Sequence, residues 1–147
     1  MIHYLKGDAT KPVGDGEKVI VHICNNRSAW GAGFVIALSN KWPITKSTYL
    51  NWGNPNLGMV QKIKVEENIT VVNMVAQNGT ISKGNPTPIR YGSLELCLTK
   101  VAFNLPPSTT IHMPRIGCGL AGGNWDQVEK IVNKVFKFNI VYIYDLI

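Results

Sequence analysis

The chain has few cysteines and no obvious means of joining them. Cys24, Cys97 and Cys118 are an odd number, and no two of them form a Cys-x-x-Cys pair. This pattern argues against a disulfide framework and lacks the ligand spacing of a zinc site, so we expect no metal and no cofactor. Cys118 has no activating partner beside it, which favours a small loop residue over a nucleophilic thiol.

Charged residues and long apolar runs are also scarce. Charged residues make up 16% of the 147 residues and apolar residues 45%, which is typical of a globular protein rather than a disordered one. No apolar run approaches the length of a membrane span, and Met1-Ile2-His3 leads directly into strand-like sequence without a signal peptide. We therefore expect a soluble, cytoplasmic protein with a single domain over residues 1–147.

The charge that is present has mostly one sign. The formal net charge is +6, which suits an anionic partner. The basic residues are spread along the chain and form no dense stripe interleaved with aromatic residues. Nucleic acid is therefore only a secondary candidate as a partner.

Short apolar runs alternate with amphipathic segments along the chain. Residues 19–24 and 69–77 are nearly continuous apolar runs, typical of strands buried on both faces. Asn124 is a good cap for a helix with an apolar stripe over 128–136, and Gln127 is placed to complete a capping box. The alternation predicts a layered α/β domain with a largely parallel sheet. The other expected elements are strands at 2–5, 58–65, 109–113 and 140–144, and helices at about 34–42, 45–52 and 90–104.

Glycine is concentrated between residues 111 and 127. Four glycines, Gly117, Gly119, Gly122 and Gly123, occupy seven positions between a short strand and a helix. Glycine lets backbone N–H groups approach a ligand closely, and the start of a helix adds a partial positive charge. The stretch predicts an anion-binding loop, with a merely flexible connection as the alternative.

Three loops are expected at the carboxyl ends of the strands, where open α/β sheets bind their ligands. They cover residues 25–33, 77–91 and 115–124. The first and third are rich in glycine and each leads into a helix, so together they would hold two phosphates. A diphosphate is therefore a natural ligand, although neither loop has the P-loop or the dinucleotide-binding pattern.

Four motifs together resemble the macro domain family over essentially the whole chain. They are Lys6-Gly7-Asp8-Ala9-Thr10, His22-Ile23-Cys24-Asn25-Asn26, Trp30-Gly31-Ala32-Gly33 and the stretch from Pro114 to Gly123. Within the family, the chain looks most similar to the small stand-alone branch that processes ADP-ribose 1''-phosphate. The resemblance implies a three-layer α/β/α macro domain with a mixed, largely parallel sheet. It also implies a phosphatase that binds ADP-ribose and hydrolyses ADP-ribose 1''-phosphate to ADP-ribose and phosphate.

The resemblance also implies which residues contact the ligand. Asp8 matches an aspartate that binds adenine, with a turn residue after Gly7 as the alternative. Trp30 is either a wall of the pocket or a core residue. The full expected set of ligand-binding residues is Gly7, Asp8, Ala9, Trp30, Gly31, Ala32, Gly33, Gln77, Arg115, Ile116, Gly117, Cys118, Gly119, Leu120, Ala121, Gly122, Gly123 and Asn124.

Three residues in and directly after the first buried run are the candidates for catalysis. Asn25 and Asn26 match a distal-ribose asparagine that could orient the attacking water, with turn capping as the alternative. His22 matches a histidine proposed as catalytic in the yeast-like phosphatases, and an imidazole can move a proton near neutral pH. The alternative for His22 is a core histidine whose hydrogen bonds are satisfied.

The sequence also departs from related branches. Gln77 and Asn78 stand where the branch that hydrolyses glutamate-linked ADP-ribose has a lysine, and Ala121 stands at its aspartate position. Asn124 replaces an acid that close relatives often carry, and an amide cannot take a proton. A non-catalytic ADP-ribose-binding module therefore stays open, as does an ADP-ribosyl hydrolase acting on ADP-ribosylated macromolecules. A basic nucleic-acid-binding domain is the remaining alternative.

Overall fold

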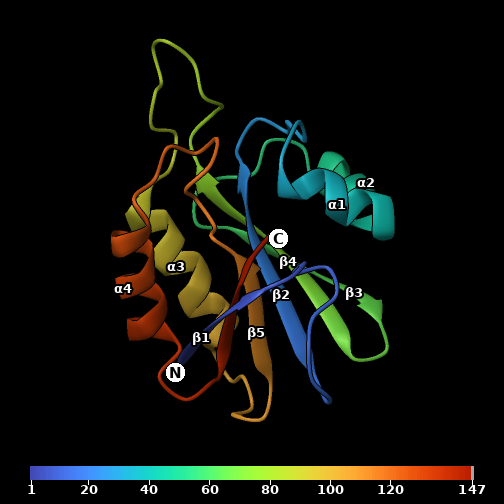
Figure 1. Ribbon diagram of the computed structural model, residues 1–147. Helices are drawn as coiled ribbons and strands as arrows, with labels where there is room; N and C mark the ends of the chain where they lie inside the picture. The colour runs from blue at the N-terminus through green and yellow to red at the C-terminus, as the bar shows by residue number, and fades with distance from the viewer. Residues whose placement is uncertain (147) are drawn as a thin grey trace.

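A mixed six-stranded sheet forms the centre of the protein, described here from a computed structural model for residues 1–146 (Figure 1). Its order is β1-β6-β5-β2-β4-β3, and every neighbouring pair is parallel except β3 and β4. The strands are β1 (Ile2–Lys6), β2 (Lys18–Asn25), β3 (Val60–Glu66), β4 (Ile69–Gln77), β5 (Thr110–Pro114) and β6 (Val141–Asp145).

Two pairs of helices cover the two faces of this sheet (Figure 1). Helices α1 (Phe34–Lys41) and α2 (Ile44–Asn51) lie on one face, and α3 (Tyr91–Ala102) and α4 (Trp125–Val135) lie on the other. The three-layer α/β/α architecture implied by the family resemblance is thereby confirmed. None of the helices in residues 1–146 is long and apolar enough to cross a membrane.

The two central strands explain the continuous apolar runs in the sequence. In β2 every residue except Ile23 is buried, and in β4 the seven residues from Val71 to Gln77 include six that are buried. Because helices cover both faces of the sheet, neither face of these strands is exposed to solvent. Apolar and polar residues therefore do not alternate along them, and β-branched residues dominate. Their carboxyl ends meet at one edge of the sheet.

The start of α4 confirms one expectation and corrects another. The side-chain oxygen of Asn124 accepts from the N–H groups of Asp126 at 2.9 Å and Gln127 at 3.4 Å, so the helix cap is present. The expected capping box is wrong, because the N–H of Asn124 donates to the hydroxyl of Tyr91 at 2.9 Å instead. This bond joins the start of α4 to the start of α3.

Candidate functional site

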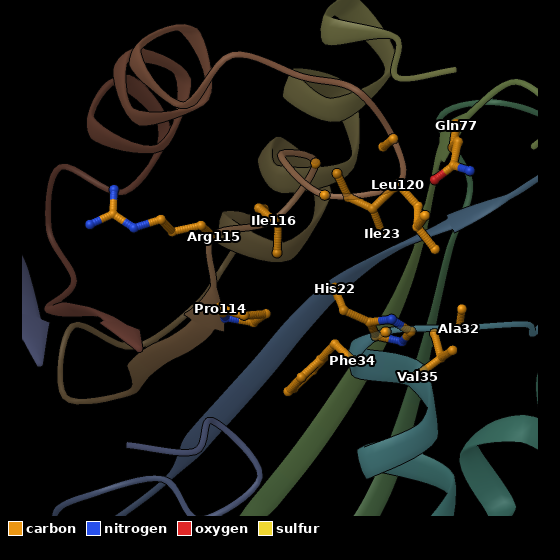
Figure 2. Close-up of a pocket in the computed structure, with 14 residues that line it drawn as sticks. His22, Ile23, Ala32, Phe34, Val35, Gln77, Pro114, Arg115, Ile116 and Leu120 are labelled. Carbon is orange, nitrogen blue, oxygen red and sulfur yellow. The ribbon is translucent and has the colours of Figure 1, made fainter. Parts of the chain in front are cut away.

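A cleft of about 230 Å³ opens at the carboxyl ends of the parallel strands, between the loop before α1 and the loop after β5 (Figure 2). This is the edge at which open α/β sheets bind ligands. Residues from both glycine-rich loops line it. The lining consists of His22, Ile23, Ala32, Gly33, Phe34, Val35, Gln77, Pro114, Arg115, Ile116, Gly117, Gly119, Leu120 and Ala121.

A second cavity of about 240 Å³ adjoins this cleft, and we call it the distal cavity. The two share the lining residues Ile23, Ala32, Val35, Gln77 and Leu120, so they form one elongated depression. The distal cavity is also lined by Cys24, Asn25, Ala29, Gly31, Thr80 and Ile81. The long loop after β4 therefore contributes to the site, as the sequence indicated.

The glycines of the two loops fall into two groups. A Cβ at Gly31 or Gly119 would meet no atom within 4 Å, which leaves the space beside these backbones open. A Cβ at Gly123 would lie 2.3 Å from the carbonyl oxygen of Gly117, and one at Gly122 would lie 2.7 Å from that of Pro86. The first group leaves room for a ligand, and the second allows the loop to pack tightly. This packing does not fit a merely flexible connection.

Asn25 organises the loop that leads into α1. Its side-chain oxygen accepts from the N–H groups of Arg27 at 2.9 Å and Ala29 at 3.1 Å, and its nitrogen donates to the carbonyl of Ala29 at 2.7 Å. The hydroxyl of Tyr49 lies 2.9 Å from the same side-chain oxygen. This geometry matches the turn-capping alternative, and the ribose-binding and water-orienting role of Asn25 stays a prediction.

Asn26 joins two of the loops around the site. Its amide nitrogen donates to the side-chain oxygen of Asn78 at 3.1 Å, and its oxygen accepts from the N–H of Gly79 at 2.8 Å. The side chain of Asn26 lines neither the cleft nor the distal cavity. The contacts of Asn26 hold the loop after β4 against the loop after β2. Its catalytic role stays a prediction.

His22 lies at the cleft but is almost fully buried. The ring packs edge-on against Trp30 and Phe34, with centroid separations of 5.5 and 6.1 Å. Its Nε2 lies 2.5 Å from Oδ1 of Asn73. Burial lowers the pKa of His22 to about 4, although the hydrogen bond with Asn73 acts in the opposite direction. The imidazole is therefore neutral at pH 7.

Other predicted contacts lie outside the two cavities. Oδ1 of Asp8 accepts from the N–H and the hydroxyl of Thr10, both at 2.8 Å, which is the geometry of the turn-residue alternative. Trp30 is 8% exposed and packs between His22 and Tyr49, which fits a core residue. The predicted ligand-binding residues that line neither cavity are Gly7, Asp8, Ala9, Trp30, Cys118, Gly122, Gly123 and Asn124.

Arg115 contributes its backbone to the cleft but not its charge. The guanidinium points away from the cleft (Figure 2) and pairs with Asp145 through two bonds of 2.6 and 2.9 Å. It also lies over the rings of Tyr4 and Trp125, 5.0 and 5.3 Å from their centroids. Pairing with Arg115 lowers the pKa of Asp145. The guanidinium of Arg115 therefore binds Asp145 and the two aromatic rings outside the cleft.

Sequence reasoning missed several lining residues. Phe34 and Val35 form the first turn of α1, immediately after the glycine loop, and Thr80 and Ile81 belong to the long loop after β4. The position of Phe34 next to Gly33 was a usable signal, because the first turn of a helix faces the same space as the loop before it. Residues 80 and 81 had no signal beyond the length of their loop.

Comparisons with known proteins agree with this geometry. No protein-family model matches the chain. A Bacteroides thetaiotaomicron protein of unknown function is 44% identical, with 99% of this chain and 98% of that one covered and a TM-score of 0.92. A macrodomain protein from Streptomyces coelicolor is 37% identical over 99% of both chains, with a TM-score of 0.85. An ADP-ribose 1''-phosphate phosphatase of Candida albicans is 27% identical, over 97% of this chain and 100% of its own length.

Proposed function

The chain belongs to the macrodomain family, and from this premise we propose that it binds ADP-ribose and hydrolyses ADP-ribose 1''-phosphate to ADP-ribose and phosphate. The observation that carries the proposal is the elongated depression between two loops whose glycines leave open space. ADP-ribose is itself elongated, with its diphosphate in the middle. The similarity to a phosphatase over the full length of both chains supports the activity.

Backbone N–H groups would hold the diphosphate. Gly33 begins α1 without a side-chain cap, so the first N–H groups of this helix remain available beside the cleft. The loop of residues 115–124 also leads into a helix, but the side chain of Asn124 already accepts from N–H groups at the start of that helix, α4. The ligand would therefore lie between the start of α1 and the loop of residues 116–121.

His22 would supply the proton transfer. A neutral imidazole accepts a proton, so we assign it as the general base that activates a water molecule. The water oxygen attacks phosphorus, its proton passes to His22, and the bond between phosphorus and the 1''-oxygen breaks. The departing oxygen then takes the proton, which returns His22 to its neutral form and leaves ADP-ribose and phosphate. His22→Ala is expected to lower turnover more than affinity.

A charge placed in the cleft tests the binding site. At Gly119 a Cβ meets nothing within 4 Å and the φ angle is not positive, so Gly119→Glu introduces a carboxylate without backbone strain. A carboxylate about 5 Å from a phosphate costs about 3 kcal/mol at an effective dielectric constant of 20. We expect ADP-ribose affinity, measured by calorimetry, to fall at least about 10-fold.

Gly84→Glu is the matched control for this experiment. Gly84 lies in the loop after β4, outside both cavities, and a Cβ there also meets nothing within 4 Å. The same change of charge should leave ADP-ribose affinity within twofold. Equal affinities of the Gly119→Glu and Gly84→Glu proteins would refute the cleft as the binding site.

A binding module without turnover is the second candidate, and one observation favours it. No aspartate or glutamate is among the residues of the described chain that line the cleft or the distal cavity. Phosphate release from ADP-ribose 1''-phosphate, measured together with ADP-ribose affinity, separates the two candidates. Multiple turnovers support the phosphatase. Tight binding without release supports a module that captures ADP-ribose or ADP-ribosylated macromolecules.

A further inference from the structure

Behind His22, the fully buried amide of Asn73 and the partly buried amide of Gln61 form a hydrogen-bond network with a defined direction. Asn73 on β4 pairs in register with His22 on β2. Its Nδ2 donates to the carbonyl oxygen of Thr45 at 3.2 Å and to Oε1 of Gln61 at 3.0 Å. Gln61 on β3 in turn donates from Nε2 to the carbonyl oxygen of Thr48 at 3.1 Å.

The two backbone carbonyls determine the orientation of both amides. A carbonyl oxygen only accepts, so the atom of Asn73 that faces Thr45 and the atom of Gln61 that faces Thr48 must be nitrogen. The side-chain oxygen of Asn73 therefore faces His22. Since that oxygen accepts, Nε2 of His22 must carry the ring proton, and the lone pair of the neutral ring lies on Nδ1.

Within residues 1–146, Cys24 is the only hydrogen-bonding neighbour of the His22 ring besides Asn73. Sγ of Cys24 lies 4.0 Å from Nδ1 and 3.8 Å from Nε2 of His22. These nearly equal distances place the sulfur beside the ring rather than in line with one nitrogen. Nδ1 is therefore the nitrogen through which His22 can serve a ligand in the cleft that it lines.

We propose that Asn73, oriented by Gln61, is a positioning residue that holds His22 in the Nε2–H form and reserves Nδ1 to accept the proton of the attacking water. This inference rests on the proposed function and extends it to residues outside the cleft. It also accounts for a fully buried asparagine in a central strand. Burying an amide is costly unless its hydrogen bonds are made, and here all three are.

The neighbours of His22 are uncharged from every side. They are Cys24 on its own strand, Asn73 on β4, Trp30 in the following loop and Phe34 on α1. Burial raises the pKa of Cys24, so its thiol is protonated at neutral pH. An aspartate in place of Asn73 would be the first charge beside the imidazole and would stabilise its protonated form.

Two measurements test the proposal. The first is ¹⁵N NMR of the wild-type protein labelled at histidine, with the His22 signals assigned by comparison with His22→Gln. We expect a neutral ring protonated at Nε2 at pH 7. The second is the pH profile of kcat for Asn73→Asp, whose acid limb should move to higher pH by more than one unit. Asn51→Asp, at the exposed end of α2, makes the same chemical change away from the site and should keep the wild-type profile.

The outcomes separate this proposal from the proposed function. A His22 ring protonated at Nδ1, or charged at pH 7, would overturn the positioning role even if phosphate is released. An unchanged pH profile in a folded Asn73→Asp protein would do the same. Absence of phosphate release from the wild type would overturn the proposed function, and the catalytic meaning of the network with it. The NMR measurement needs no variant at Asn73, so it decides the tautomer even if Asn73→Asp does not fold.

Discussion

Acid is expected to destabilise this protein through two buried histidines. His112 is fully buried on β5, with Nε2 2.7 Å from the hydroxyl of Thr110 and Nδ1 2.7 Å from that of Tyr144. Burial lowers the pKa of His112 to about 4, as it does for His22, against an ordinary value of 6.5. Both rings are therefore neutral in the folded chain at pH values where the unfolded chain is already protonated.

The sign and the size follow from linkage. Between pH 6.5 and 4 the unfolded state binds protons that the folded state does not, so stability falls as the pH is lowered. Above pH 6.5 the two histidines leave the free energy of unfolding unchanged. As the pH falls from 6.5 toward 4, that free energy decreases progressively. At pH 5 each histidine has cost about 2 kcal/mol relative to pH 7.5. Together they remove a large part of the 5 to 15 kcal/mol that is typical of a folded domain.

Urea unfolding, followed by the fluorescence of the four tryptophans, measures this effect at pH 7.5 and pH 5.0. His112→Gln should shrink the loss of unfolding free energy between the two pH values by about 2 kcal/mol, because glutamine does not titrate. His3→Gln removes an exposed histidine and should leave that loss unchanged. If His112→Gln retains the full pH dependence of the wild type, the argument from burial is wrong.

Three further substitutions test the loops. Gly123→Ala should cost about 1 to 3 kcal/mol in urea unfolding, because its Cβ would lie 2.3 Å from the carbonyl oxygen of Gly117; a neutral effect would show that the loop yields. Tyr49→Phe removes a hydroxyl 2.6 Å from the carbonyl oxygen of Asn25, so stability should fall by about 1 to 2 kcal/mol and ADP-ribose affinity several-fold, whereas wild-type values would deny this contact a role. Cys118→Ser should release phosphate within twofold of the wild-type rate, because burial raises the pKa of that thiol and keeps it protonated. A loss of rate above 100-fold would show that Cys118 acts as a nucleophile.

Elements with a strong local pattern could be predicted from the sequence. The continuous apolar runs at 19–24 and 69–77 match β2 and β4, and Asn124 caps α4 as expected. These features depend on neighbouring residues, whose periodicity the chain itself displays. The glycine cluster could be located in the same way. The sequence did not show which of its glycines leave open space and which pack against other backbone. Whether a glycine packs or leaves space depends on residues about thirty positions away, such as Ile89 beside Gly117.

The surroundings of Asn25 show what periodicity in the sequence leaves open. The sequence predicts a catalytic role for Asn25 beside that of His22, and this role stays a prediction. The strand pairing shifts register between Cys24 and Asn25, so that Asn25 lies opposite Gln77, and its side chain meets Tyr49 and the turn of residues 27–29. The residue without a partner in this irregularity is Ala76 on β4, and the periodicity of the sequence does not reveal it.

Binding and catalysis therefore differ in how far they can be predicted from this sequence. Binding through backbone N–H groups requires small residues at particular positions, and the glycines that meet this requirement are visible in the sequence. Proton transfer requires that the ring proton of His22 be held on one particular nitrogen. That position depends on Asn73 and Gln61, and finally on the carbonyl oxygens of Thr45 and Thr48, which any residue type would present equally well. A backbone acceptor leaves no trace in the side-chain sequence, so the proton of His22 can be located only in the folded chain.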